Sequence, residues 1–240
     1  MVALDIPDAS RALDIVEKLN GHAEIFKIGL ELFSSVGPQI VEAIQRKGKK
    51  VFLDLKFHDI PNTASNASAV AARLGVFMFN VHTFGGFEMM KRCSDSASET
   101  SIKEGLQRPK IVGVTVLTSL TIKELKGEIG IHRDVKDQVR HLASMAQKAG
   151  LDGVVASAHE VSEIKRLCGN NFLTVVPGIR SSCFPTDDQK RRATISETLR
   201  EGADYIVMGR SLLKQEDPVR AIELISDELK SEQKGLFKCN

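Results

Sequence analysis

The stretch VFLDLKFHDIPNT, residues 51–63, indicates the kind of fold that this chain adopts. Its first half is apolar and strand-like, and successive side chains of a strand point to opposite faces. Asp54 and Lys56 therefore share a face with Phe52, on a strand that is otherwise suited to burial. Buried charges are costly unless they are paired or used. Because Asp59 follows at once on the next loop, the stretch predicts a site at the carboxyl end of a buried strand.

The same pattern continues along the whole chain, where short apolar strand candidates alternate with amphipathic helix candidates. The strand candidates are Val2–Asp5, Ile25–Gly29, Val51–Lys56, Phe77–His82, Ile111–Thr118, Gly153–Ser157, Leu173–Pro177 and Tyr205–Gly209. Eight such strand–helix units in 240 residues predict a (β/α)8 TIM barrel that forms a single domain over residues 1–240, because about 250 residues is typical of that fold. The alternative is a doubly wound open sheet. That fold usually has a glycine-rich turn after the first strand, where this chain has Asp5-Ile-Pro-Asp8.

Composition and charge exclude several classes of protein. The chain is 42% hydrophobic and 27% charged, as is ordinary for a soluble globular protein. Its formal net charge of +2 gives no reason to expect a nucleic-acid polymer or a membrane surface as partner. No apolar run approaches the roughly 20 residues of a membrane span, and no signal peptide is visible, so we expect a cytoplasmic protein. The four cysteines are scattered, which favours reduced thiols over a zinc site.

Charged side chains stand at the predicted carboxyl ends of the first three strands. They are Asp5, Lys27, Asp54 and Lys56. The active site of a TIM barrel lies at this end of its strands, and neighbouring strand ends meet at one rim. The alternative is a structural network of ion pairs that closes the barrel mouth. Four charges of alternating sign on adjacent strand ends favour a functional site over that alternative.

A second signal follows the last two strands. Gly178 and Arg180 come after strand seven, and Gly209 and Arg210 come after strand eight. Barrels frequently bind a phosphate at these two loops, where glycine lets the backbone approach the anion and arginine can grip it with two hydrogen bonds. The alternative is a plain turn with a solvated arginine. The polar loop 181–189 lies beside this site and is either a lid or an ordinary surface loop.

With these residues in place, the chain resembles the orotidine 5′-monophosphate decarboxylase family in its free-standing bacterial form. The resemblance runs from residue 4 to residue 218, which is nearly the whole chain. It rests on KIGLELF at 27–33, DLKFHDIPNT at 54–63, NVHTFGG at 80–86, VTVLTS at 114–119, LDGVVASAHE at 151–160, TVVPGIR at 174–180, DDQ at 187–189 and VMGRS at 207–211. The second block is highly specific, and the others agree with it in order and spacing.

The resemblance implies a role for each matched residue. Lys56 matches the proton donor, and Asp54 matches the carboxylate beside the substrate carboxylate. Lys27 matches the lysine that completes this network and contacts the ribose. Asp59 matches the residue that family members send across a homodimer interface into the neighbouring subunit's site. The substrate-binding matches are Asp5 at the ribose, Thr63 near the ribose and phosphate, Thr118 at the pyrimidine, Arg180 at the binding position after strand seven, and Gln189, Gly209 and Arg210 at the phosphate.

The function that this resemblance implies is decarboxylation of orotidine 5′-monophosphate to UMP and CO2 in de novo pyrimidine biosynthesis, with no cofactor and no metal. Two other functions remain open. Magnesium-dependent decarboxylases and synthases of sugar phosphates resemble one another in placing an acidic ligand where Lys27 stands here, and an ammonium there would repel Mg²⁺. A catalytically silent phosphate-binding barrel, acting as a binding or regulatory module, would not need Lys56 beside Asp54.

Overall fold

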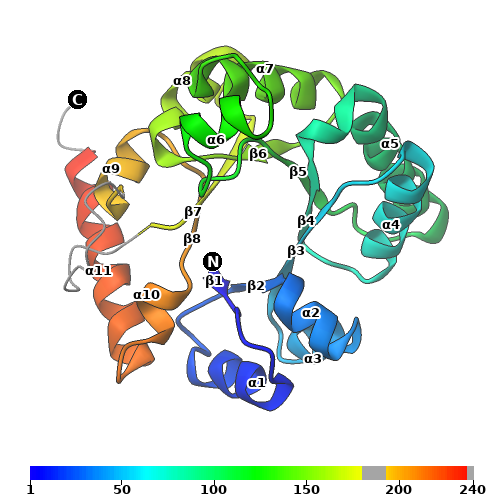
Figure 1. Cartoon of the computed structure of the whole chain (residues 1–240). Helices are drawn as coiled ribbons and strands as arrows, with labels where there is room; N and C mark the ends of the chain where they lie inside the picture. The colour runs from blue at the N-terminus through cyan, green and yellow to red at the C-terminus, as the bar shows by residue number, and fades with distance from the viewer. Residues whose placement is uncertain (180–192, 237–240) are drawn as a thin grey trace.

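The computed structural model describes the backbone of residues 1–179 and 193–236 and the side chains of residues 1–179 and 193–230. Eight parallel strands form one sheet, hydrogen-bonded in chain order (Figure 1). They are β1 (Val2–Ala3), β2 (Ile25–Gly29), β3 (Lys50–Phe57), β4 (Met78–His82), β5 (Lys110–Val114), β6 (Gly153–Val155), β7 (Leu173–Pro177) and β8 (Tyr205–Val207). A parallel bridge between Val2 and Met208 joins the two ends of the sheet. The predicted TIM barrel is therefore confirmed, and the open doubly wound sheet is excluded.

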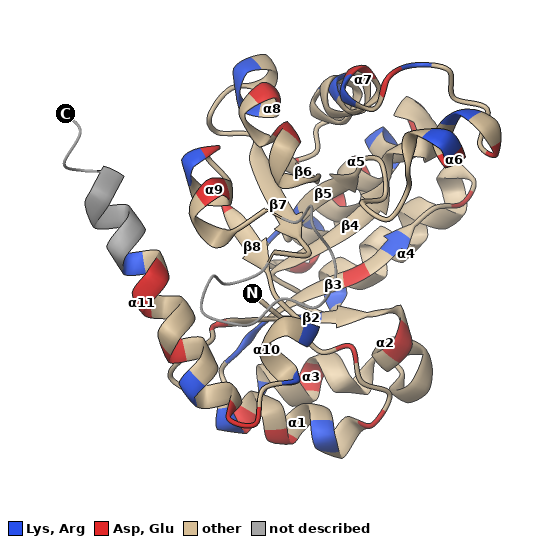
Figure 2. Ribbon diagram, turned by 60° about the vertical axis from the view of Figure 1, so that its left-hand side comes forward, with Lys and Arg blue, Asp and Glu red and all other residues tan. Residues whose placement is uncertain are grey.

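The helices form a ring outside the strands (Figure 1). They are α1 (Ala9–Lys18), α2 (Leu30–Val36), α3 (Gln39–Gln45), α4 (Pro61–Arg73), α5 (Gly86–Glu104), α6 (Ile122–Gly127), α7 (Val135–Lys148), α8 (Val161–Cys168), α9 (Ile195–Arg200), α10 (Arg210–Leu213) and α11 (Pro218–Leu236), with short 3₁₀ turns η1 (Thr83–Gly85) and η2 (Ala158–Glu160). Acidic and basic residues are intermixed on this ring (Figure 2). No helix in the described part of the chain is long and apolar enough to cross a membrane.

The core has two layers on either side of the strands, as the alternation of side chains requires. Inside the barrel, Phe52 packs with five other strand side chains, among them Met78 and Val175. On the outer face of the same strand, Val51 and Leu53 belong to the large cluster between the sheet and the helices. The predicted faces of this strand are thus confirmed. Asp54 follows Phe52 on the inner face, so its charge points into the mouth of the barrel rather than toward the helices.

Four predicted strands, those over 2–5, 111–118, 153–157 and 205–209, end earlier in the structure, at Ala3, Val114, Val155 and Val207. One of these differences moves a predicted site residue. The strand expected over 111–118 ends at Val114, so Thr118 is not at a strand end but in the loop beyond it, where its side chain is exposed. The ladder ends because the chain turns, with the amide of Leu120 bonded to the carbonyl of Leu117 at 2.9 Å. Thr121 then caps helix α6 with a capping box. The apolar character of this loop hid the turn in the sequence.

Candidate active site

The four charged side chains predicted to meet at the rim do meet there. The ammonium of Lys27 lies 3.0 Å from Asp5 Oδ1 and 3.1 Å from Asp54 Oδ2. The ammonium of Lys56 lies 2.7 Å from the other oxygen of the same carboxylate, Asp54 Oδ1. Charges therefore alternate along the row Asp5, Lys27, Asp54 and Lys56, which we call the charged array. It stands at the carboxyl ends of β1, β2 and β3, where barrel active sites lie.

The two central side chains of the charged array are buried, and the two outer ones are partly exposed to solvent. Side chains of Lys27 and Asp54 are only 10% and 14% exposed, whereas those of Lys56 and Asp5 are 32% and 46% exposed. The two central charges are buried but paired on both sides, which is the condition under which burial of a charge is tolerated. The two outer groups remain accessible, so a ligand at the barrel mouth can contact an ammonium at one end and a carboxylate at the other.

Both central groups are held in their charged forms. Burial alone would lower the pKa of Lys27, but the neighbouring Asp54 and Asp5 carboxylates outweigh it and raise that pKa. Burial alone would likewise raise the pKa of Asp54. The two lysine ammonium groups and a hydrogen bond from Asn80 outweigh this effect and lower it. Asp54 is therefore a carboxylate at neutral pH, beside an ammonium that does not release its proton there.

Lys56 has an unusual backbone. Among the described residues it is the one non-glycine residue with a positive φ, at 51°. This left-handed conformation costs a side-chain-bearing residue about 1–2 kcal/mol. It coincides with an irregularity in the ladder, because the register between β3 and β4 shifts between Leu53 and Phe57. Strain of this kind is kept where the surrounding structure enforces it, often at functional sites.

Asn80 stands at the predicted carboxyl end of the fourth strand, but the sequence offers no reason to assign it a role in the site. It is fully buried in β4, next to the irregular part of β3. Its Nδ2 donates to Asp54 Oδ1 at 2.6 Å, and its Oδ1 accepts from the backbone amide of Lys56 at 2.7 Å. The available signal was a single amide side chain in the apolar strand MFNVH, beside the strand that carries the charges.

Two matched residues of the same sequence block lie outside the charged array. Asp59 is exposed just past β3, and its carboxylate accepts a hydrogen bond from the amide of the next residue, Ile60, at 2.7 Å. Thr63 is exposed in the first turn of α4. In a single chain, therefore, the described contacts of Asp59 do not reach Lys56 or Asp54.

The matched residues after the last strands are only partly within the described region. Gly209 caps α10 beside the array, where a side chain would come within 3.4 Å of Asp5 Oδ2 and 3.2 Å of Ala3 Cβ. Arg210 is the first residue of α10, and its side chain is exposed. Arg180, Gln189 and the candidate lid 181–189 lie outside the described residues.

A stack of rings adjoins Lys56. The ring of His82 lies 5.2 Å from that of His58 and 5.3 Å from that of Phe84, and both pairs are stacked. Burial, and then the nearby His58 and Lys56, lower the pKa of His82 to about 4. His82 is therefore neutral at pH 7 and does not add a further positive charge beside Lys56.

Acidification should destabilise the fold partly through His82. Its pKa is about 4 in the folded chain, whereas an unperturbed histidine has a pKa of about 6.5. Between these values the unfolded chain binds more protons, so the free energy of unfolding falls as the pH is lowered from 7 to 4. His82→Phe keeps a ring in the stack but cannot titrate. Urea unfolding at pH 7 and pH 5 should show a smaller loss of stability for this variant than for the wild type, and equal losses would contradict the assignment.

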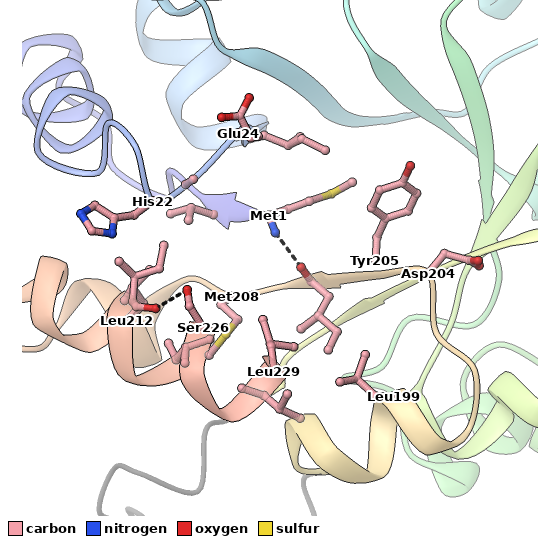
Figure 3. A pocket seen from close by; sticks show the side chains of 17 residues that line it. Met1, His22, Glu24, Leu199, Asp204, Tyr205, Met208, Leu212, Ser226 and Leu229 are labelled. Carbon is pink, nitrogen blue, oxygen red and sulfur yellow. Dashed lines mark hydrogen bonds between the residues drawn. The ribbon is translucent and has the colours of Figure 1, made fainter. Parts of the chain in front are cut away.

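A cavity of about 320 Å³ lies at the opposite end of the barrel (Figure 3). It is lined mostly by apolar side chains between β8 and helices α9 and α11, such as Leu199, Ile222 and Leu229. Its lining includes none of the charged array. This amino-terminal face of a barrel serves stability rather than chemistry, so the charged array is the candidate active site. Among the described residues, no group of three or more His, Cys, Asp and Glu side chains is placed to hold a metal ion.

The chain is similar to known proteins over nearly its whole length. Residues 1–225 match the model of the orotidine 5′-phosphate decarboxylase / HUMPS family. A protein named orotidine 5′-phosphate decarboxylase from Moorella thermoacetica is 44% identical to the chain over 229 residues, which cover 95% of the chain and 91% of that protein. A protein of the same name from Legionella pneumophila is 46% identical over 229 residues, which cover 95% of the chain and 98% of that protein. A crystal structure of orotidine 5′-phosphate decarboxylase from Lactobacillus acidophilus superposes with a TM-score of 0.83 at 36% identity, covering 95% of this chain and 96% of that one.

Proposed function

The chain belongs to the orotidine 5′-phosphate decarboxylase / HUMPS family, and from this premise we propose that it decarboxylates orotidine 5′-monophosphate to UMP in de novo pyrimidine biosynthesis. It is thus a carboxy-lyase. The relatives named orotidine 5′-phosphate decarboxylase match it over nearly its whole length. The observation that carries the proposal is the ammonium of Lys56, held 2.7 Å from the carboxylate of Asp54 at the barrel mouth. Incubation with orotidine 5′-monophosphate should yield UMP and CO2 in equal amounts.

The chemical problem is a carbanion. When the bond between C6 and the substrate carboxylate breaks, CO2 leaves and the electron pair stays on C6. A preorganised positive charge beside C6 stabilises that pair as it develops. Lys56 supplies the charge, and its Nζ then gives a proton to C6, so that the product carries C–H and the lysine is briefly neutral. The lysine regains a proton from water when the product leaves.

Asp54 acts on the other side of the same bond. A carboxylate held charged beside the substrate carboxylate disfavours the bound substrate relative to the transition state, from which the negative CO2 group is departing. Lys27 supports this role, because its ammonium is 3.1 Å from Asp54 and keeps the pKa of that carboxyl low. Lys27 and Asp5 also face the mouth of the barrel, where they bind the ribose.

The remaining matched residues bind the parts of the substrate that do not react. Thr118 contacts the pyrimidine, and Thr63 contacts the ribose and phosphate. The phosphate is held by Gly209 and Arg210 together with Gln189 and Arg180. Binding energy from such remote groups can be used to lower the activation free energy of the reaction at C6. The position of Gly209 beside Asp5 supports this arrangement, because it brings the turn after β8 next to the ribose end of the charged array.

Arg210→Ala should weaken binding of the 5′-phosphate. A guanidinium grips a phosphate dianion through charge-assisted hydrogen bonds, whereas a nucleoside offers it nothing to hold. The value of kcat/KM should therefore fall for orotidine 5′-monophosphate and change little for orotidine. Arg166→Ala on the exposed face of α8 is the matched control and should leave both values unchanged. Equal losses on nucleotide and nucleoside would rule out a phosphate-specific role for Arg210.

We further propose that the chain acts as a homodimer in which Asp59 reaches the neighbouring subunit's site. Two exposed apolar side chains support an interface near this residue. Ile60, which follows Asp59, is 67% exposed, and Phe87 at the start of α5 is 44% exposed. Burying such side chains against a second copy is favourable, and a two-fold contact would use the same surface on both chains.

The proposed environment and partners follow from the substrate. We propose a single-domain cytoplasmic enzyme whose ligand is a small nucleotide, with no nucleic-acid polymer and no membrane as partner. The positions of acidic and basic residues alternate along the outer helices (Figure 2), which supports this proposal.

The magnesium-dependent sugar-phosphate enzymes are the closest rival, and the chemistry of the charged array argues against them. Mg²⁺ prefers carboxylate oxygens in an octahedral shell. Here the ammonium of Lys27 lies within 3.1 Å of both Asp5 and Asp54 and takes the place between them that a cation would need. We therefore propose that the reaction needs neither a metal nor a cofactor.

A further inference from the structure

Within the described part of the chain, Asn80 is the one uncharged side chain that is hydrogen-bonded to two members of the charged array. Its amide group bonds the carboxylate of Asp54 and the backbone of Lys56. We propose that Asn80 is a positioning residue that fixes Lys56 and Asp54 in their reactive arrangement. This inference rests on the proposed function, since it concerns how the proposed proton donor is held.

The ladder between β3 and β4 explains why an amide is needed at this position. Leu53 pairs with Phe79 and Phe57 pairs with Val81, so three residues of β3, numbers 54–56, stand opposite the single residue Asn80. The extra residues form a bulge, in which the backbone cannot complete its ladder hydrogen bonds. The side chain of Asn80 takes over one of them, because its Oδ1 accepts from the amide of Lys56 at 2.7 Å as a peptide carbonyl would.

That hydrogen bond acts on the strained residue itself. Lys56 has a φ of 51°, a conformation that needs support from its surroundings. Without an acceptor for its amide, Lys56 would lose the hydrogen bond that stabilises its left-handed backbone conformation. The ammonium of Lys56 would then leave its place 2.7 Å from Asp54. A displacement of about 1 Å at a reacting group can cost about 100-fold in rate.

The other half of the amide acts on Asp54. Its Nδ2 donates to Asp54 Oδ1, the oxygen that also faces Lys56. The carboxylate is thus held by Lys27 on one oxygen and by Lys56 and Asn80 on the other. An asparagine offers a donor and an acceptor on one short, rigid group, and each of the two is used here. Its side chain is fully buried, so water does not offer either group an alternative partner.

Asn80→Ala should lower kcat about 100-fold and change KM less than about threefold, because the phosphate and ribose contacts are not touched. The matched control is Thr83→Val. Thr83 is also fully buried and also makes a rim hydrogen bond, from its Oγ1 to the carbonyl of Val114 at 2.7 Å, but it does not contact the charged array. This control should keep the wild-type kcat. A kcat for Asn80→Ala within about threefold of the wild type, or an equal fall in the control, would overturn the inference.

Asn80→Asp separates positioning from mere packing, because the shape is retained and only the donor is lost. The introduced carboxyl group would face Asp54 Oδ1 across a contact that is 2.6 Å in the wild type. Two carboxyl groups so close cannot both ionise easily. The pair therefore shares one proton, and the pKa at which it loses that proton is raised. With that proton the new group donates to Asp54 as the amide does. The charged and titratable groups near this pair are Lys56, on β3 with Asp54, and Lys27, which pairs with Asp54. His82, two residues beyond Asn80 on β4, and the stacked His58 lie next to Lys56, and the register partner of Asn80 on β5 is Val112.

The ratio of kcat for Asn80→Asp to that of the wild type should consequently rise as the pH is lowered, by about tenfold per pH unit above the upper pKa of the pair. A purely structural defect would give a ratio that is constant with pH, and that result would overturn the inference even if Asn80→Ala does not fold. The proposed function fails separately, if the wild type itself does not decarboxylate orotidine 5′-monophosphate or if Lys56→Ala remains active.

Discussion

Replacing Lys56 with alanine should abolish decarboxylation of orotidine 5′-monophosphate. The ammonium at this position is the proposed source of both the charge that stabilises the carbanion and the proton that quenches it, and no other described lysine touches Asp54 from the same side. A folded variant that keeps more than a tenth of the wild-type kcat, equivalent to about 1.4 kcal/mol, would show that the assigned role is wrong.

The fold should survive this substitution. The side chain of Lys56 is 32% exposed at the rim, so its loss opens no cavity in the core. Asp54 keeps Lys27 and Asn80 as partners. Lys50→Ala is the matched control, because Lys50 is an exposed lysine at the other end of the same strand. The control should keep full activity, and thermal unfolding should show both variants folded at the assay temperature.

Mixing two inactive variants, Asp59→Ala and Lys56→Ala, should restore activity. If Asp59 acts in the neighbouring subunit's site, a mixed dimer has one site with both lesions and one intact site. With free subunit exchange about half of the dimers are mixed, so about a quarter of all sites should work. The measurement is kcat per total site after co-incubation, compared with each variant alone.

A second mixture is the control for this experiment. Asp54 and Lys56 belong to the same barrel, with an ion pair of 2.7 Å between them. In a mixed dimer of Asp54→Ala and Lys56→Ala each site therefore carries one lesion, and this mixture should stay inactive. If the Asp59→Ala mixture also recovers nothing although subunit exchange is demonstrated, Asp59 serves its own subunit and the shared-site proposal fails.

The barrel could be predicted because its signals are local and repeated. Alternation along residues 51–54 gives the inner and outer faces of β3, and Phe52, Val51 and Leu53 pack as that alternation requires. Strands β2 and β7 have the predicted bounds, Ile25–Gly29 and Leu173–Pro177. The convergence of the charged array followed from the same periodicity, since side chains on the inner faces of adjacent parallel strand ends must meet at one rim.

The finer geometry of the site could not be predicted, because it depends on pairing between strands. The bulge opposite Asn80 and the positive φ of Lys56 arise from the register of β3 with β4, which no local pattern in DLKFHD reveals. Asn80 could be placed at a strand end but given no role for the same reason, since the partners of an amide in a strand are known only once its neighbours are. Thr118 was placed on a strand because hydrophobicity continues past Val114, where the ladder has already ended.

Decarboxylation of orotidine 5′-monophosphate by the wild-type chain, measured with excess EDTA present, tests metal-free catalysis by the charged array most directly. With Lys27 between Asp5 and Asp54, we expect the chain to turn the nucleotide over with the same kcat/KM in EDTA as in Mg²⁺. Absence of turnover, or turnover that EDTA removes and Mg²⁺ restores, would contradict the proposed mechanism and favour a metal-dependent enzyme of the same barrel family.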